Sequence, residues 1–307
     1  MRMNSHISVF RRKLKKEWPL HLMLLLPVAV AFIYHYIPMI GALMAFEDYK
    51  PALGFFKSKW VGFENFVTLF TMGDFPQVIR NTIGIALAKI ITGILVPVVF
   101  ALLLNEMKNL TVKKMIQTVV YMPHFLSWVL VASMLIEILA QDGLFNRALG
   151  LFGSQPKTVY LADPGKFPTV VVLSNVWKEF GYGTIIYLAA LAGVDPNLYE
   201  AAAIDGAGRW KQTLHVTLPG IAPMIVLMTI LSLGNILNAG FDEIFNLYSP
   251  IVYETGDIID TFVYRMGFQS LQYSISTAAG LFKSAISCIL IILSYRIAYK
   301  TTGYRVF

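Results

Sequence analysis

The sequence predicts an all-α polytopic membrane protein with six transmembrane helices and cytoplasmic N- and C-termini. Of its 307 residues, 56% are hydrophobic and only 14% are charged. Soluble domains carry about 25% charged residues, so a lipid bilayer is the expected solvent. The net charge of +7 does not indicate a nucleic-acid partner, because the Lys and Arg residues cluster beside apolar segments rather than on a polar domain.

Six segments are mostly apolar over the length of about 20 residues that a helix needs to cross the hydrocarbon core. Helices are preferred to barrel strands, because the apolar runs are long and continuous, whereas barrel strands alternate in polarity over about ten residues. A cleaved signal peptide is the alternative for the first segment, but the apolar sequence there continues too far. The predicted spans are residues 20–46, 83–104, 115–140, 169–194, 221–241 and 277–299.

The distribution of basic residues predicts the orientation. With the N-terminus inside, the cytoplasmic segments hold more Lys and Arg than the much longer outside connections. This arrangement gives a basic cytoplasmic segment 1–19, a transmembrane domain 20–299 and a cytoplasmic tail 300–307. The connection 195–219 between the fourth and fifth spans then also lies in the cytoplasm.

This cytoplasmic connection carries signals for two short helices. Asp195 is a good N-cap, and Pro196 fits the first helical position, where its missing N–H costs nothing. Gly206 and Gly208 can supply the left-handed conformation that ends a helix. A second short helix is expected over 209–216, ending before Leu218 and Pro219. The resulting helix-turn-helix has one face of small side chains, which suits docking into a groove on another protein, although a plain connector is the alternative.

The same connection contains a motif of fixed spacing. Glu200-Ala201-Ala202 is followed after three residues by Gly206 and after nine more by Val216-Thr217-Leu218-Pro219. This pattern resembles the EAA motif of binding-protein-dependent ABC transporter permeases, with Val216 in the place of the usual Ile. The resemblance implies a type I ABC importer permease whose loop couples to the ATPase subunit. The coupling residues it implies are Glu200, Ala201, Ala202, Asp205, Gly206, Ala207, Arg209, Leu218 and Pro219.

Further segments resemble the carbohydrate branch of this family, particularly permeases for oligosaccharides or polysaccharide fragments. They are Tyr36-Ile37-Pro38-Met39, Ala45-Phe46-Glu47-Asp48-Tyr49-Lys50-Pro51, Trp60-Val61-Gly62-Phe63-Glu64-Asn65-Phe66 and Tyr121-Met122-Pro123-His124. The resemblance implies a multi-pass permease of the bacterial cytoplasmic membrane that forms the path for a sugar. A non-sugar solute stays open, because importers of amino acids, phosphate and metals share the loop.

The resemblance also implies the partners. They are a second homologous permease chain, a cytoplasmic ABC ATPase dimer and an extracytoplasmic solute-binding protein that delivers the sugar. ATP and Mg are expected on the ATPase subunits and no cofactor on this chain, because the sequence has no phosphate-binding loop of the form GxxxxGK[ST].

Catalytic residues are not expected in this chain. The single cysteine, Cys288, allows no disulfide within one chain, and the five His residues lack the spacing of metal ligands. An intramembrane enzyme would need a nucleophile and a base that the sequence does not indicate. A secondary transporter driven by an ion gradient would need acidic residues deep in several spans and inverted repeats. Only Glu137 and Glu179 meet the first requirement.

Polar residues inside the spans suggest a translocation path, since buried charges in membranes commonly mark one. The charged candidates are Lys89, Glu137, Lys178, Glu179 and Lys283. A sugar site combines aromatic faces with hydrogen-bonding groups, and the fourth and fifth spans supply both. The predicted lining is Asn175, Trp177, Lys178, Tyr182, Asn235 and Asn238. The alternative is that these residues pair across helices and serve only packing.

Overall fold

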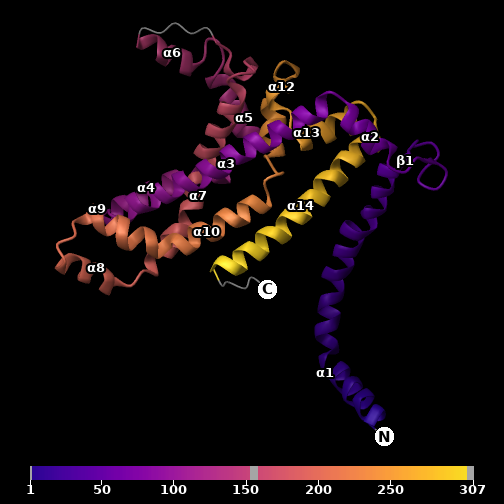
Figure 1. The fold of residues 1–307 in the computed structure, drawn as a ribbon, viewed down its shortest axis with the longest axis horizontal. Helices are drawn as coiled ribbons and strands as arrows, with labels where there is room; N and C mark the ends of the chain where they lie inside the picture. Colours follow the sequence, from indigo (N-terminus) through magenta and orange to yellow (C-terminus); the bar gives the residue numbers. More distant parts are fainter. Residues whose placement is uncertain (1, 153–157, 303–307) are drawn as a thin grey trace.

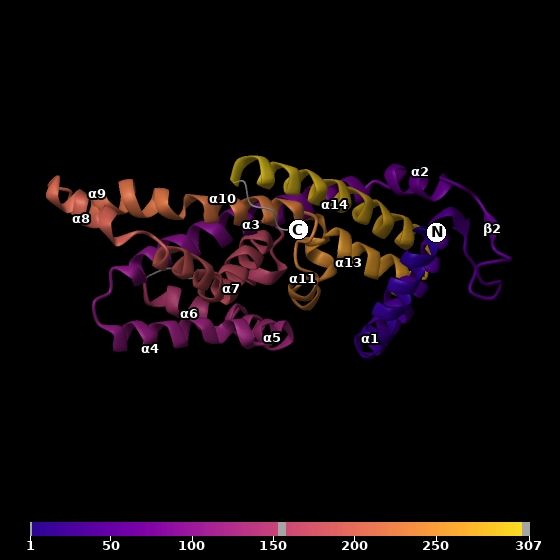
Figure 2. The ribbon, with the colours of Figure 1, turned by 90° about the horizontal axis from the view of Figure 1, so that it is seen from below.

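The structure, a computed structural model, describes residues 2–152 and 158–302. It is an elongated helical bundle with one short hairpin, in which β1 (Glu47–Asp48) pairs antiparallel with β2 (Lys59–Trp60) (Figures 1 and 2). The α-helices are α1 (Arg2–Ala31), α2 (Glu64–Thr71), α3 (Asp74–Asn105), α4 (Leu110–Tyr121), α5 (Trp128–Ile138), α6 (Leu144–Leu151), α7 (Phe167–Ala192), α8 (Pro196–Ile204), α9 (Arg209–Gln212), α10 (Leu218–Gly234), α11 (Phe241–Leu247), α12 (Tyr253–Gly256), α13 (Ile259–Tyr264) and α14 (Tyr273–Thr302). Shorter π and 3-10 segments are η1 (Phe32–Tyr36), η2 (Ile37–Phe46), η3 (Met122–Phe125), η4 (Tyr160–Ala162), η5 (Thr213–Thr217), η6 (Pro250–Val252) and η7 (Arg265–Gln269).

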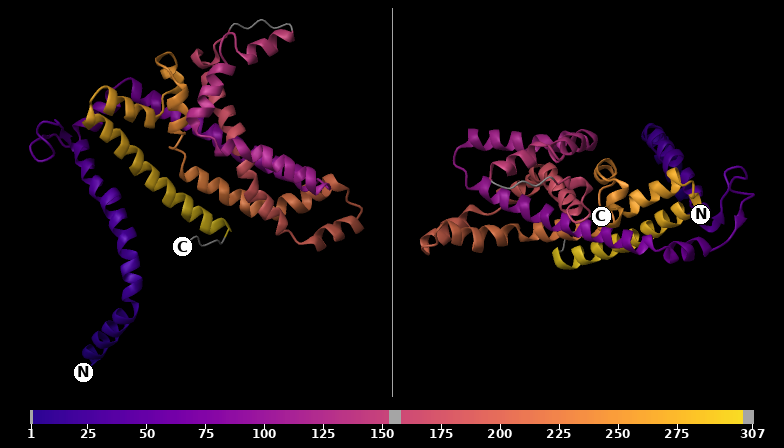
Figure 3. Two further views of the ribbon diagram at one scale, coloured as in Figure 1. Left: turned by 180° about the vertical axis from the view of Figure 1, so that it is seen from behind. Right: turned by 90° about the horizontal axis from the view of Figure 1, so that it is seen from above.

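The N-terminal helix stands apart from the bundle. α1 continues through the π-helical η1 into the 3-10 helix η2, and this change of winding occurs next to Pro38, which has no N–H for an α-helical bond. Figure 3 shows α1 pointing away from the other helices, and the most apolar part of this span has no buried residue. Only η2 returns to the bundle, where it packs against α14.

Four helices of the described residues are long and apolar enough to cross a membrane. They are Glu17–Phe46, Asp74–Asn105, Arg209–Gly234 and Tyr273–Lys300. The pair Leu110–Phe125 and Trp128–Ile138 becomes a fifth if its two bent parts form one span. α7 is 26 residues long but carries Lys178 and Glu179 near its middle, and it is not among them. The structure thus supports four or five spans, whereas the sequence predicts six.

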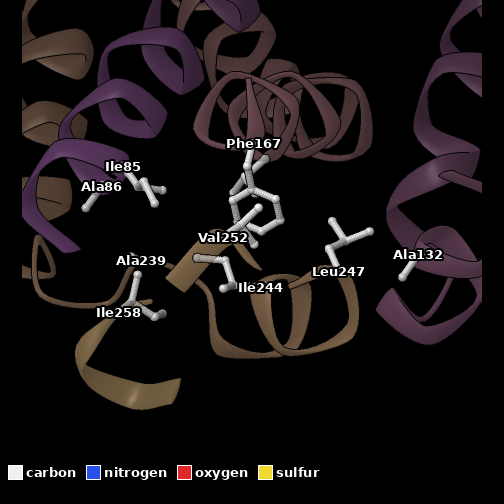
Figure 4. Packing of buried hydrophobic residues seen from close by; sticks show 10 residues of the cluster. Ile85, Ala86, Ala132, Phe167, Ala239, Ile244, Leu247, Val252 and Ile258 are labelled. Carbon is white, nitrogen blue, oxygen red and sulfur yellow. The ribbon is translucent and has the colours of Figure 1, made fainter. Parts of the chain in front are cut away.

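The core holds the helices together around the first residues of α7. α3 and α7 lie side by side, and α10 packs along α14. Phe167 at the start of α7 is fully buried in a cluster that includes Ile244 of α11 and Val252 of η6 (Figure 4). This cluster fixes the segment after α10 against α7.

The predicted span 115–140 contains two helices instead of one. α4 ends at Tyr121, η3 follows, and α5 begins at Trp128 after a bend of 99°. Pro123 accounts for the break, because it cannot donate the main-chain hydrogen bond that a continuing helix needs. Ser127 starts the new helix as an N-cap, its side chain accepting a hydrogen bond of 3.4 Å from the Leu130 N–H.

The predicted span 221–241 also ends earlier than expected. α10 ends at Gly234, and α11 begins at Phe241 after a turn over residues 235–240. Gly240 has a φ of +99°, a conformation that strongly favours glycine. Asn235 and Asn238 therefore lie on a break between two helices and not on a continuous helix face.

Candidate functional site

The predicted coupling loop forms two helical segments, as its capping signals indicate. Asp195 caps α8, because its side chain accepts a hydrogen bond of 2.9 Å from the Asn197 N–H, and Pro196 occupies the first helical position. The α8 helix continues through the alanines to Ile204. The local sequence is therefore sufficient to define where this helix begins.

Gly206 ends α8 in a Schellman motif. Its φ is +77°, and its N–H donates to the Ala203 carbonyl at 3.0 Å. The Ala207 N–H donates to the Ala202 carbonyl at 2.9 Å, which completes the motif. Gly208 does not share this role, because its φ of −68° and ψ of 167° are extended and it serves as the N-cap of α9. Of the two predicted helix terminators, only Gly206 is left-handed.

The second helix of the loop does not stop before Leu218, in contrast to the prediction. α9, η5 and α10 form one uninterrupted helix over Arg209–Gly234. Within η5 the winding widens, so that the Leu218 N–H bonds the Thr213 carbonyl. Pro219 has no N–H to donate within this turn, and a local π turn can re-satisfy a backbone group freed in this way. A rigid helix thus connects the loop directly to a predicted span.

The outer surface of the loop is exposed and partly apolar. Ile204 is 87% exposed, Trp210 74% and Leu198 51%. Glu200 and Asp205 are also exposed, and α8 and α9 lie at one end of the molecule (Figure 2). Large apolar side chains at such exposure are typical of a surface that another protein covers.

Arg209 makes a contact that the sequence did not indicate. Its Nη1 lies 3.5 Å from Oε2 of Glu106, the residue that caps the end of α3. Both side chains are well exposed, so the contribution of this pair to stability is small, on the order of 0 to 1 kcal/mol. The pair nevertheless joins the loop to the turn between α3 and α4.

A cavity of about 470 Å³ lies between α3, α7 and α10. Three of the predicted path residues line it: Asn175 from α7, and Asn235 and Asn238 from the break after α10. Their amide groups can both donate and accept hydrogen bonds, which suits hydroxyl groups. Tyr187, Lys89 and Ser232 also contribute polar groups to the wall.

The other three predicted path residues lie elsewhere. Trp177 lines a second, mostly apolar pocket of about 420 Å³ between α5, α6 and α7. Tyr182 stacks on the His124 ring with 4.0 Å between the ring centres, and Lys178 is buried at the bend between α4 and α5. Residues on one helix point to different neighbours at this spacing, and the sequence alone could not separate them.

Only one member of a charged pair beside the cavity was recognisable from the sequence. Lys89 of α3 forms an ion pair with Glu243 of α11, and Glu243 also accepts a hydrogen bond of 2.8 Å from Ser174. Lys89 was recognisable as a charge within a span, but Glu243 follows the predicted fifth span and carried no such signal. The break after α10 brings it back to the middle of α3.

The described residues contain no group of three His, Cys, Asp or Glu side chains that could hold a metal ion. The arrangement offers hydrogen-bonding amides, the buried Lys89–Glu243 ion pair and an exposed loop.

Comparison with known proteins identifies the family. Residues 93–302 match the family described as binding-protein-dependent transport system inner membrane component. This chain belongs to that family. The match confirms the family predicted from the loop motif, and it includes both the loop and most of the cavity wall.

Individual relatives extend over nearly the whole permease. Protein LplB of Bacillus subtilis is 42% identical over 94% of this chain and 90% of its own length. The polygalacturonan/rhamnogalacturonan transport system permease protein YteP of the same organism shows the same identity and coverage. A third relative, the sn-glycerol-3-phosphate transport system permease protein UgpA of Salmonella choleraesuis, is 27% identical over 97% of this chain.

Solved structures of an alginate importer share the fold. A crystal structure of a bacterial ABC transporter involved in the import of the acidic polysaccharide alginate contains a chain with a TM-score of 0.86 and 37% identity. The similarity covers 95% of this permease and 98% of that chain. A second structure, in complex with an alginate pentasaccharide-bound periplasmic protein, gives a TM-score of 0.87. The permease thus has the fold of an ABC importer subunit.

Proposed function

We propose that this permease forms part of the translocation path for a sugar, an oligosaccharide or polysaccharide fragment, in an ATP-driven importer of the bacterial cytoplasmic membrane. The observation that carries the proposal is the 37% identity, over 95% of the chain, to a subunit of the alginate importer. The relative YteP, named for polygalacturonan and rhamnogalacturonan transport, supports the same substrate class.

In this proposal the exposed loop docks on the ATPase. The left-handed Gly206 and the exposed Ile204 and Trp210 give it a defined shape with an apolar contact surface. The continuous helix Arg209–Gly234 would carry a displacement of the loop into the membrane, because a helix moves largely as a rigid body. Glu200, Asp205 and Arg209 would supply polar contacts. ATP and Mg bind to the ATPase subunits and not to this chain.

The cavity with Asn175, Asn235 and Asn238 is the part of the path that this chain provides. Six spans with both termini in the cytoplasm agree with the distribution of basic residues, and α7 then crosses the membrane despite its charges. A second permease chain completes the path, and an extracytoplasmic solute-binding protein delivers the sugar to its outer end.

One observation favours a second candidate substrate. UgpA, a permease for sn-glycerol-3-phosphate by name, aligns with 97% of this chain, although at only 27% identity. A phosphorylated small solute is therefore the alternative to a saccharide.

The proposal can be tested by reconstituting this permease in liposomes with the second permease, the ATPase and the binding protein encoded beside it. Uptake of labelled trigalacturonate, maltotriose and glycerol 3-phosphate is then measured with and without internal ATP. We expect ATP-dependent uptake of at least one saccharide. Uptake of glycerol 3-phosphate alone would replace the sugar by the alternative substrate, and uptake driven by an ion gradient without ATP would refute the importer mechanism.

A further inference from the structure

Lys89 lies at the point where the cavity meets the break between α10 and α11. Its Nζ donates a hydrogen bond of 2.7 Å to the Ala239 carbonyl and a second one to Oε2 of Glu243. The Lys89 side chain is 10% exposed and belongs to the cavity wall, together with Asn238 and Gly240. The break that presents the asparagines to the cavity is therefore held by this lysine.

Lys89 has more N–H donors than it has acceptors in the described part of the chain. An ammonium group has three N–H donors. Within the described part of the chain, Nζ has two acceptors, the Ala239 carbonyl and the Glu243 carboxylate. Because Lys89 lines the cavity, its third donor is available to an acceptor inside it.

Glu243 neutralises the positive charge of Lys89 at the cavity wall. Glu243 is only 1% exposed, and its other oxygen accepts the hydrogen bond from Ser174. The ion pair therefore adds a strong donor to the cavity without adding net charge. A saccharide carries oxygen acceptors, either hydroxyl or carboxylate, and Lys89 lines the same cavity as the three asparagines.

We infer that Lys89 is a substrate-binding residue that donates a hydrogen bond to an oxygen atom of the translocated saccharide, while Glu243 fixes its position. This inference rests on the proposed function and adds to it a specific charged ligand on α3. The sugar oxygen is the shared chemistry, and the experiment distinguishes a hydroxyl from a carboxylate.

Lys178 provides a matched control for the structural part of this role. Lys178 is also buried, and its Nζ donates a hydrogen bond of 2.8 Å to the main-chain carbonyl of His124 at a helix break. The same Nζ pairs with Glu179, 3.2 Å from its Oε1. It does not line the cavity. Replacing either lysine removes one main-chain hydrogen bond and one ion pair, and for Lys178 also a contact of 5.3 Å with the Trp128 ring centre. Only Lys89 would also contact the substrate.

The test measures equilibrium binding of labelled trigalacturonate, and of its neutral methyl ester, to the complete importer in lipid nanodiscs. We expect Lys89→Met to weaken binding of at least one of them about tenfold more than Lys178→Met, as loss of one hydrogen bond from a charged donor predicts. Equal losses for the acid and the ester assign Lys89 to a hydroxyl. A larger loss for the acid assigns it to the carboxylate.

Glu243→Gln gives a second measurement that a purely structural role would not produce. The uncompensated Lys89 charge should raise the preference for the acid over the ester about tenfold. A structural role alone would change both affinities equally. If the wild-type importer binds neither compound and takes up no saccharide in the liposome assay, the proposed sugar substrate fails and the inference with it. If it takes up only maltotriose, the same comparison of Lys89→Met with Lys178→Met is made with labelled maltotriose, and equal losses there overturn the inference alone. If it binds the acid or the ester, but the two lysine variants weaken binding equally and Glu243→Gln leaves the preference unchanged, only the inference is overturned.

Discussion

Lys178 of α7 donates a hydrogen bond of 2.8 Å to the main-chain carbonyl of His124, inside the bend between α4 and α5. Lys89 of α3 does the same for Ala239 in the break between α10 and α11. A broken helix leaves carbonyl groups without partners, and such groups are costly away from water. In this protein, a lysine from a neighbouring helix satisfies one carbonyl at each break.

Replacing Lys178 should therefore loosen the bend. Lys178→Met leaves the His124 carbonyl unpaired and should lower the stability by about 2 kcal/mol, the cost of a buried unsatisfied polar group. Thermal unfolding of the purified chain in nanodiscs measures this loss. Lys166→Met is the control, because the ion pair of Lys166 with Asp163 is partly exposed and contributes at most about 1 kcal/mol. Equal losses in both variants would contradict the role of Lys178.

Gly206 and Gly208 should respond differently to the same substitution. Gly206→Ala places a Cβ at φ +77° and costs about 1 to 2 kcal/mol locally, which should distort the end of α8 and reduce co-purification of the ATPase. Gly208→Ala should retain the ATPase, since its backbone is extended and a Cβ there meets no atom within 4 Å. Loss of the ATPase with both variants would show that the backbone conformation of Gly206 is not the reason.

The buried pair of Asp257, which follows α12, and Arg265, at the start of η7, should be a major stabilising contact. Arg265 Nη2 lies 2.5 Å from Asp257 Oδ2, and the Asp257 side chain is 2% exposed. Burial raises the pKa of the Asp257 carboxyl, and hydrogen bonds from Thr261 and Arg265 oppose this rise. Asp257→Asn leaves the guanidinium without its charged partner and should cost about 3 kcal/mol.

The control for this substitution is Asp48→Asn. Asp48 and Lys50 are 3.4 Å apart and more than half exposed, so this pair should contribute less than about 1 kcal/mol. Denaturation of both variants in the same lipid environment compares them. The prediction is wrong if Asp257→Asn is no more damaging than Asp48→Asn.

Asn238 and Trp177 were both expected to line the path, and the structure separates them. Asn238→Ala removes an amide from the cavity and should reduce the rate of sugar uptake about tenfold, as expected for loss of one hydrogen bond. Trp177→Ala changes the apolar pocket between α5, α6 and α7 and should leave uptake near the wild-type rate. Uptake is compared in liposomes at equal amounts of protein. An equal effect of both substitutions would mean that the cavity is not the path.

Much of this protein follows from local sequence. Long apolar runs predict its helices, Asp195 and Pro196 determine where α8 begins, and the Glu200 to Pro219 motif predicts the family that comparison confirms. These features depend on a few neighbouring residues, on capping hydrogen bonds and on chain length against the thickness of a bilayer. Such interactions are complete within one segment and therefore readable from it.

The cavity and the ion pair between Lys89 and Glu243 depend on the tertiary structure. Asn235 and Asn238 face it because α10 ends at Gly234, and that break is stabilised by Lys89, a residue about 150 positions away in sequence. Glu243 meets Lys89 for the same reason, and Lys178 faces His124 instead of the cavity. Which neighbour a buried polar group finds depends on how distant helices pack. The sequence by itself therefore determined where the long apolar segments and the two-helix loop lie, and packing between helices decided where two of the predicted helices break and which polar residues line the cavity.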